Sequence, residues 1–75
     1  MNKARRKVIE DLKARLEEIK SELEFVQEQE QEAFDNLPES LQGAERGQQM
    51  ETYIDNMAYA VSNIEDAMDS LELDL

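Results

Sequence analysis

Residues 9–37 read IEDLKARLEEIKSELEFVQEQEQEAFDNL, and the spacing of the apolar side chains in this stretch decides the fold. A period of about 3.5 residues keeps an apolar seam on one side of a slightly supercoiled helix. One helix cannot bury such a seam alone, so the sequence predicts a partner helix. The seam consists of every third and fourth residue in turn, and only Glu30 is polar: Ile9, Leu12, Leu16, Ile19, Leu23, Val26, Glu30, Ala33 and Leu37.

A second stretch with the same spacing follows a helix-breaking segment. Pro38 lacks an N–H group and disfavours helical backbone at the residue before it, so the first helix is expected at about 2–35 and a turn at about 36–40. Gly43 and Gly47 each cost about 1 kcal/mol in a helix, so residues 41–49 are expected to be irregular or frayed, unless the glycines allow a close approach. A second helix reaching about residue 73 is predicted from the seam of Met50, Ile54, Met57, Val61, Ile64, Met68, Leu71 and Leu75.

The fold class expected is therefore all-α, a single domain over 1–75 forming an antiparallel, coiled-coil-like two-helix hairpin. A short connection favours antiparallel neighbours, although pairing between two chains satisfies the same pattern. A fold about residue 40 would place opposite each other the residues whose numbers sum to about 80. The pairs expected are Ile9 with Leu71, Leu12 with Met68, Leu16 with Ile64, Ile19 with Val61, Leu23 with Met57, and Val26 with Ile54. The basic residues Lys3 to Lys7 would then lie beside Glu72 to Leu75.

Several large apolar side chains lie outside these two seams, namely Val8, Phe25, Phe34, Tyr53 and Tyr59. A hairpin alone would leave them partly exposed. Exposed apolar surface favours association, so a homo-oligomer is expected, most simply a dimer that forms a four-helix bundle.

The charge is strongly negative and unevenly distributed. The net charge is −11: residues 1–20 hold seven basic and four acidic side chains, whereas residues 21–75 hold fifteen acidic side chains and one basic one, Arg46. Nucleic acid and membrane surfaces would be repelled by most of the chain, so neither is expected as a direct partner. The basic N-terminal residues are not followed by the apolar segment of a signal peptide, so a cytoplasmic location is expected.

The side chains that support most catalytic and metal sites are missing. The sequence contains no His and no Cys, which removes the usual general base and the commonest metal ligands. Carboxylate pairs at helical spacing, such as Glu28 and Glu32, lack the Glu-x-x-His motif of di-iron bundles. The expectation is a non-enzymatic protein without a metal or another cofactor.

One region is not explained by the seams. Glu30 occupies a seam position, and Arg46 is the single cation of the acidic segment. An ion pair between them is one interpretation. The other is that the region binds a partner or a small anionic, nucleotide-like ligand, because arginine donates bidentate hydrogen bonds and helix N-termini offer free N–H groups. The candidate residues are Glu30, Ser40, Gly43, Glu45, Arg46, Gly47, Gln48, Gln49 and Tyr53.

The segment LPESLQGAERGQQM, together with the acidic, heptad-rich helix after it, resembles short acidic helical-hairpin proteins of bacteria, mainly Gram-positive ones, and of their phages. The resemblance covers about residues 36–72. It implies a cytosolic, non-enzymatic small protein, assigns no functional residue, and makes interference with a host system a reasonable hypothesis for a phage protein.

Three functions follow from the sequence. The first is a structural or protein-interaction module that self-associates and can bind another protein. The second is an acidic inhibitor that mimics nucleic acid. The third is an oligomer that sequesters a small anion near Arg46. The mimic would use the carboxylates of Glu22, Glu24, Glu28, Glu32, Asp35, Glu39, Glu45, Glu51 and Asp55.

Overall fold

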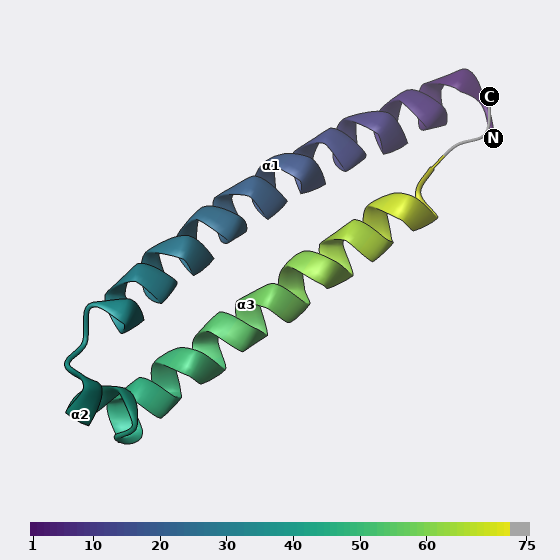
Figure 1. The fold of residues 1–75 in the computed structure, drawn as a ribbon. Coiled ribbons are helices and arrows are strands. Elements are labelled where there is room, and N and C mark those ends of the chain that lie inside the picture. Colours follow the sequence, from purple (N-terminus) through teal and green to yellow (C-terminus); the bar gives the residue numbers. More distant parts are fainter. Residues whose placement is uncertain (73–75) are drawn as a thin grey trace.

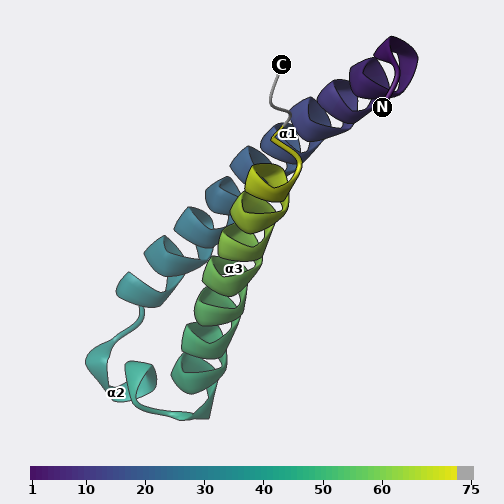
Figure 2. The same cartoon turned by 90° about the vertical axis from the view of Figure 1, so that its right-hand side faces the viewer.

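The computed structural model describes residues 1–72, and every secondary-structure element in this range is a helix. The helices are α1 (Lys3–Asp35), α2 (Glu39–Gln42) and α3 (Glu45–Ser70). The two long helices, α1 and α3, lie side by side and run in opposite directions, with α2 at one end (Figures 1 and 2). The result is an elongated helix pair that measures 58 × 15 × 14 Å.

The ends of helix α1 are set by a side-chain cap at its N-terminus and by the proline that follows its C-terminus. The Asn2 side chain caps the N-terminus, because its Oδ1 accepts a hydrogen bond of 2.8 Å from the Arg5 backbone N–H. No Gly or Pro interrupts the next 33 residues. At the other end the Asn36 N–H donates to the Glu32 carbonyl, and Pro38 follows two residues later.

The connection between the long helices differs from the expectation of a turn at 36–40 followed by an irregular stretch. Only residues 36–38 and 43–44 are non-helical, because Leu41 and Gln42 belong to α2 and residues 45–49 already belong to α3. The expected irregular start at 41–49 is therefore wrong for most of its length. The physical reason is the close approach that Gly47 permits, described below.

At its other end α3 stops at Ser70, and Leu71 caps it with hydrogen bonds to carbonyls of the last turn. The helix was expected to reach about residue 73, which lies outside the described residues, as does the expected seam residue Leu75.

The seam expected for α3 faces α1, whereas the seam expected for α1 is only half right. All seven described seam residues of α3 are half-buried, from Met50 to Leu71. In α1 the seam residues Ile9, Leu16, Leu23 and Glu30 are half-buried, as is Leu37 just after the helix. The residues of α1 that share the contact with them are also half-buried: Lys13, Lys20, Gln27 and Phe34. The intervening seam residues Leu12, Ile19 and Val26 are instead 39%, 50% and 48% exposed.

The register of the helix pair also differs from the expected one. Lys20 pairs with Glu65 at 3.3 Å and Lys13 pairs with Glu72, so opposed residue numbers sum to 85 rather than about 80. Because α2 adds a helical turn after Pro38, the chain folds about Gln42 instead of residue 40. Glu72 therefore lies beside Lys13 rather than beside Lys3 to Lys7, and residues 73–75 lie outside the described part.

The pair has almost no interior. Gly47 is the one fully buried residue within residues 1–72, and no large apolar side chain there is fully enclosed. In the same range no helix has the length and apolar character needed to cross a membrane.

Candidate functional site

The candidate region lies at the end of the helix pair where α2 meets α3, and Gly47 allows these two helices to approach closely. A Cβ added to Gly47 would lie 2.1 Å from the Gln42 carbonyl oxygen and 2.6 Å from the Leu41 oxygen. Real Cβ atoms do not approach backbone oxygens so closely, so only glycine fits. Gly43 differs, because a Cβ there would meet nothing within 4 Å. Gly47 thus serves a packing role.

Gln42 ties the connection back to α1. Its Nε2 donates to the Leu37 carbonyl at 3.1 Å and to the Phe34 carbonyl at 3.3 Å. The Phe34 carbonyl, in the last turn of α1, also accepts a hydrogen bond of 3.0 Å from the Leu37 N–H, and the Leu37 carbonyl lies in the connection just after α1. The sequence analysis missed Gln42. Its only signal in the sequence is a long amide side chain placed just after the break at Pro38.

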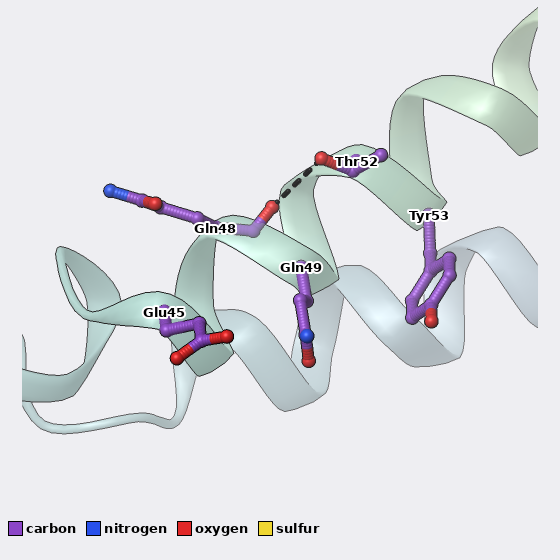
Figure 3. A pocket seen from close by; sticks show the side chains of 5 residues that line it. All are labelled: Glu45, Gln48, Gln49, Thr52 and Tyr53. Carbon is purple, nitrogen blue, oxygen red and sulfur yellow. Dashed lines mark hydrogen bonds between the residues drawn. The ribbon is translucent and has the colours of Figure 1, made fainter.

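The start of α3 carries a shallow groove of about 320 Å³ lined by Glu45, Gln48, Gln49, Thr52 and Tyr53 (Figure 3). In Figure 3 the side chains of Glu45, Gln49 and Tyr53 extend from the same side of α3, as residues four apart do. The Thr52 hydroxyl donates to the Gln48 carbonyl at 3.0 Å. Because every lining residue comes from one helix, the groove lies on the surface of α3 and not between two elements.

The groove offers hydrogen bonds but little charge. It presents one carboxylate, two amides, one hydroxyl and one phenol, and no cation lines it. All five residues are exposed, so water competes for each group. The lining suits contact with a protein surface better than capture of an anion, which needs preorganised donors or positive charge.

The structure brings only some of the nine candidate residues together. Glu45, Gln48, Gln49 and Tyr53 line the groove, and the Gln48 Nε2 also donates to the Gly43 carbonyl at 3.3 Å. Arg46 is exposed but is not part of the lining. The remaining candidates lie elsewhere: Ser40 is exposed in α2, Gly43 lies in the connection, Gly47 is buried and Glu30 is half-buried on α1.

Glu30 and Arg46 do not form the ion pair considered from the sequence. Within residues 1–72 the ion pairs closer than 4 Å are Lys7–Asp11, Lys13–Glu72 and Lys20–Glu65. In the observed register Glu30 lies opposite residue 55, which is about two and a half helical turns from Arg46.

Hydrogen bonds to carboxylates shift the pKa of two lysines on α1. The hydrogen bond with the Glu65 carboxylate raises the pKa of Lys20 above its ordinary value of 10.5. The hydrogen bond with Asp11 raises the pKa of Lys7 in the same way. Both shifts favour the charged form that these lysines already have at neutral pH, so neither creates a proton donor or acceptor for catalysis.

Metal chemistry has no evident site in the described part of the chain. Residues 1–72 contain no group of three or more Asp or Glu side chains close enough to hold an ion. Comparison of the whole chain with protein-family models, curated proteins and solved structures finds no match.

Proposed function

We propose that this chain is a two-helix hairpin that acts as a non-enzymatic protein-interaction or structural module, and that it self-associates into a four-helix bundle. The observation that carries the proposal is the exposure of large apolar side chains along a helix pair in which no apolar side chain of residues 1–72 is fully buried. A bundle of this size needs apolar area out of water to offset the conformational entropy of folding. A second pair of helices supplies that burial.

The exposed apolar residues are too many to be incidental in so small a chain. Leu12, Ile19 and Val26 follow one another along one side of α1 and are 39%, 50% and 48% exposed, whereas Val8, Phe25 and Tyr59 lie outside this row as isolated surface residues. Isolated surface apolar residues are normal, but a continuous row of them usually marks an interface.

Sedimentation equilibrium tests the proposal directly. Over about 1–100 μM the full chain is expected to sediment with at least twice its mass of 8.7 kDa, with the helical circular dichroism retained. A folded species of single-chain mass across that range would contradict the proposal. An unfolded chain at the lowest concentrations, folding as concentration rises, would support it, since folding and association are then coupled.

Nucleic-acid mimicry is the second candidate, because all nine carboxylates considered for it are exposed. Glu24 and Glu28 lie within a shallow groove on α1 together with Gln27 and Gln31. If a basic protein binds there, replacing Glu24 and Glu28 with Gln should weaken that binding and its salt dependence while leaving the sedimentation of the chain unchanged.

A further inference from the structure

The two long faces of the helix pair differ in chemistry. The charged face holds both ion pairs between α1 and α3, and residues seven apart in sequence lie in one column along it. On α1 this column is Glu10, Glu17, Glu24 and Gln31, and on α3 it is Glu51, Ala58, Glu65 and Glu72. Grooves on this face join Glu10 and Glu17 to Met68, and Gln31 to Glu51.

The opposite face, which we call the uncharged face, has columns of a different composition. Over the middle of the helix pair its α1 column is Leu12, Ile19, Val26 and Ala33, and its α3 column is Tyr53, Ala60 and Ala67; Arg5 and Arg46 continue these columns toward the two ends, beyond the face. A groove of about 310 Å³ joins Leu12, Arg15 and Ile19 to Leu71, the residue that caps α3. The next column outward on α3 is uncharged, with Gln49, Asn56, Asn63 and Ser70, whereas the next column outward on α1 carries Arg15 and Glu22 at the border of the face.

The charges of the chain favour a second copy on this face. Two chains that each carry −11 repel one another, and contact through the charged face would bring carboxylates together. The uncharged face carries no carboxylate over its seven column residues. A partner of opposite charge, by contrast, would gain nothing from binding there.

Resting on the proposed self-association, we propose that a second copy packs its α3 against this α1 across the uncharged face. The two copies are related by a two-fold axis parallel to the helices, so the α1–α3 connections of both copies lie at the same end of the bundle. Each residue of α1 then meets the residue of the second α3 at its own level, where the numbers sum to about 85, as they do within one chain.

Side-chain sizes match in that register. Ile19 meets Ala67 of the second copy, Val26 meets Ala60, and the small Ala33 meets the large Tyr53. Large residues opposite small ones let the two layers interdigitate, as close packing requires. Neighbouring helices also run antiparallel throughout the bundle, which favours their dipoles.

The alternative axis, perpendicular to the helices, is less favourable. It would lay α1 on α1, bringing Ile19 against Val26 and placing Glu22 of one copy close to Glu22 of the other. In the proposed arrangement Glu22 lies level with Asn63, whose amide donates to a carboxylate. Contact between the uncharged faces is therefore more favourable when α1 of one copy packs on α3 of the other than when it packs on α1 of the other.

The size of the face is sufficient for a dimer. From Leu12 to Ala33 it is about 30 Å long, and two helices are about 20 Å wide. Two copies would therefore remove roughly 1,200 Å² from solvent, at the lower end of the range for stable interfaces.

Disulfide trapping tests the arrangement, since the sequence has no cysteine. Chains carrying Ile19→Cys and chains carrying Ala67→Cys are mixed, unfolded and refolded together, then oxidised. The expected result is a disulfide between the two variants in most of the mixed dimers. A matched mixture of Glu24→Cys and Ala58→Cys, both on the charged face, should yield at least tenfold less crosslinked product.

The other outcomes separate this inference from the proposed function. A dimer in which Ile19→Cys crosslinks only to itself or to Val26→Cys would overturn the arrangement and leave self-association standing. A dimer that crosslinks through Glu24→Cys would overturn the choice of face. A folded monomer in sedimentation would overturn both proposals.

Discussion

At the scale of single residues, Gly47 has the most demanding environment. Replacing it with Ala puts a Cβ within 2.1 Å of the Gln42 carbonyl oxygen, and neither backbone can move without separating α2 from α3. We expect Gly47→Ala to lower the free energy of unfolding by about 1–3 kcal/mol, the usual cost of an overpacked site. Urea unfolding followed by circular dichroism measures it.

Gly43→Ala is the matched control for that substitution. Gly43 has φ −85° and ψ −4°, which any residue adopts, and open space surrounds its Cβ position. Alanine restricts the unfolded chain, so the variant should be unchanged or up to about 1 kcal/mol more stable. Equal destabilisation of both variants would show that Gly47 makes no special contact.

Lys20 gives a prediction about pH. Because its contact with Glu65 raises its folded-state pKa above 10.5, the stabilisation is complete below about pH 10.5 and is lost as the pH rises through the higher folded value. Lys20→Met should therefore lower the melting temperature at pH 8, and this difference should shrink above pH 10.5. Lys3→Met, which removes an exposed lysine outside the described ion pairs, should show no such change. A difference that stays constant to pH 12 would rule out the linkage.

At the scale of whole elements, the sequence predicted α3 better than α1. The α3 seam is bordered by the carboxylates of Glu51 and Glu65 on one side and by the small side chains of Ala60 and Ala67 on the other, so its large apolar side chains mark the face that meets α1. In α1 the apolar surface spans two adjacent columns, one with Leu16 and Leu23 and one with Ile19 and Val26. A heptad pattern alone does not say which column meets the neighbour within the chain. The column of Lys13 and Lys20, on the opposite side of Leu16 and Leu23 from Ile19 and Val26, is the one that faces α3, because these lysines extend apolar stems across the contact and reach carboxylates of α3.

The register could not be predicted either, because it depends on the connection. Pro38 correctly marked a break, but the four residues of α2 and the close approach at Gly47 moved the fold point to Gln42. Both features arise from contacts between segments that lie apart in sequence. Helix propensity alone disfavours a glycine within a helix. In the folded chain, however, Gly47 is what allows α3 to pack closely against α2.

Gln42 is expected to hold that register. Gln42→Ala removes hydrogen bonds to the Phe34 and Leu37 carbonyls and should cost about 1–2 kcal/mol in unfolding free energy. Gln49→Ala, an exposed amide in the groove on α3, should change it by less than about 0.5 kcal/mol. Thermal and urea unfolding of the two variants compares them. A Gln42→Ala protein as stable as the unaltered chain would mean that solvent satisfies these carbonyls equally well.

At the scale of the whole molecule, the structure gathers only part of the candidate set in one place. Four of the nine candidate residues line one groove, but Glu30 and Arg46 lie apart because the register places them at different levels. The apolar residues outside the two seams did indicate that apolar surface would remain exposed. They did not place that surface on one face, since which side of each helix is free becomes known only once the pair is assembled.

The uncharged face leads to a prediction about how the melting temperature depends on protein concentration. If two pairs associate through it, the melting temperature should rise with protein concentration, because the dimer is favoured by mass action. Ile19→Asp places a carboxylate at the centre of the uncharged face, where burial without a partner is costly. We expect this variant to lose the concentration dependence and to sediment at the mass of a single chain.

Phe25→Asp provides the control: Phe25 is 59% exposed and lies two residues after the inward Leu23, so it points away from α3 and from the uncharged face. It should keep both the dimer and the concentration dependence. If Phe25→Asp dissociates the protein and Ile19→Asp does not, the interface lies on the outer side of α1 and the uncharged face is free.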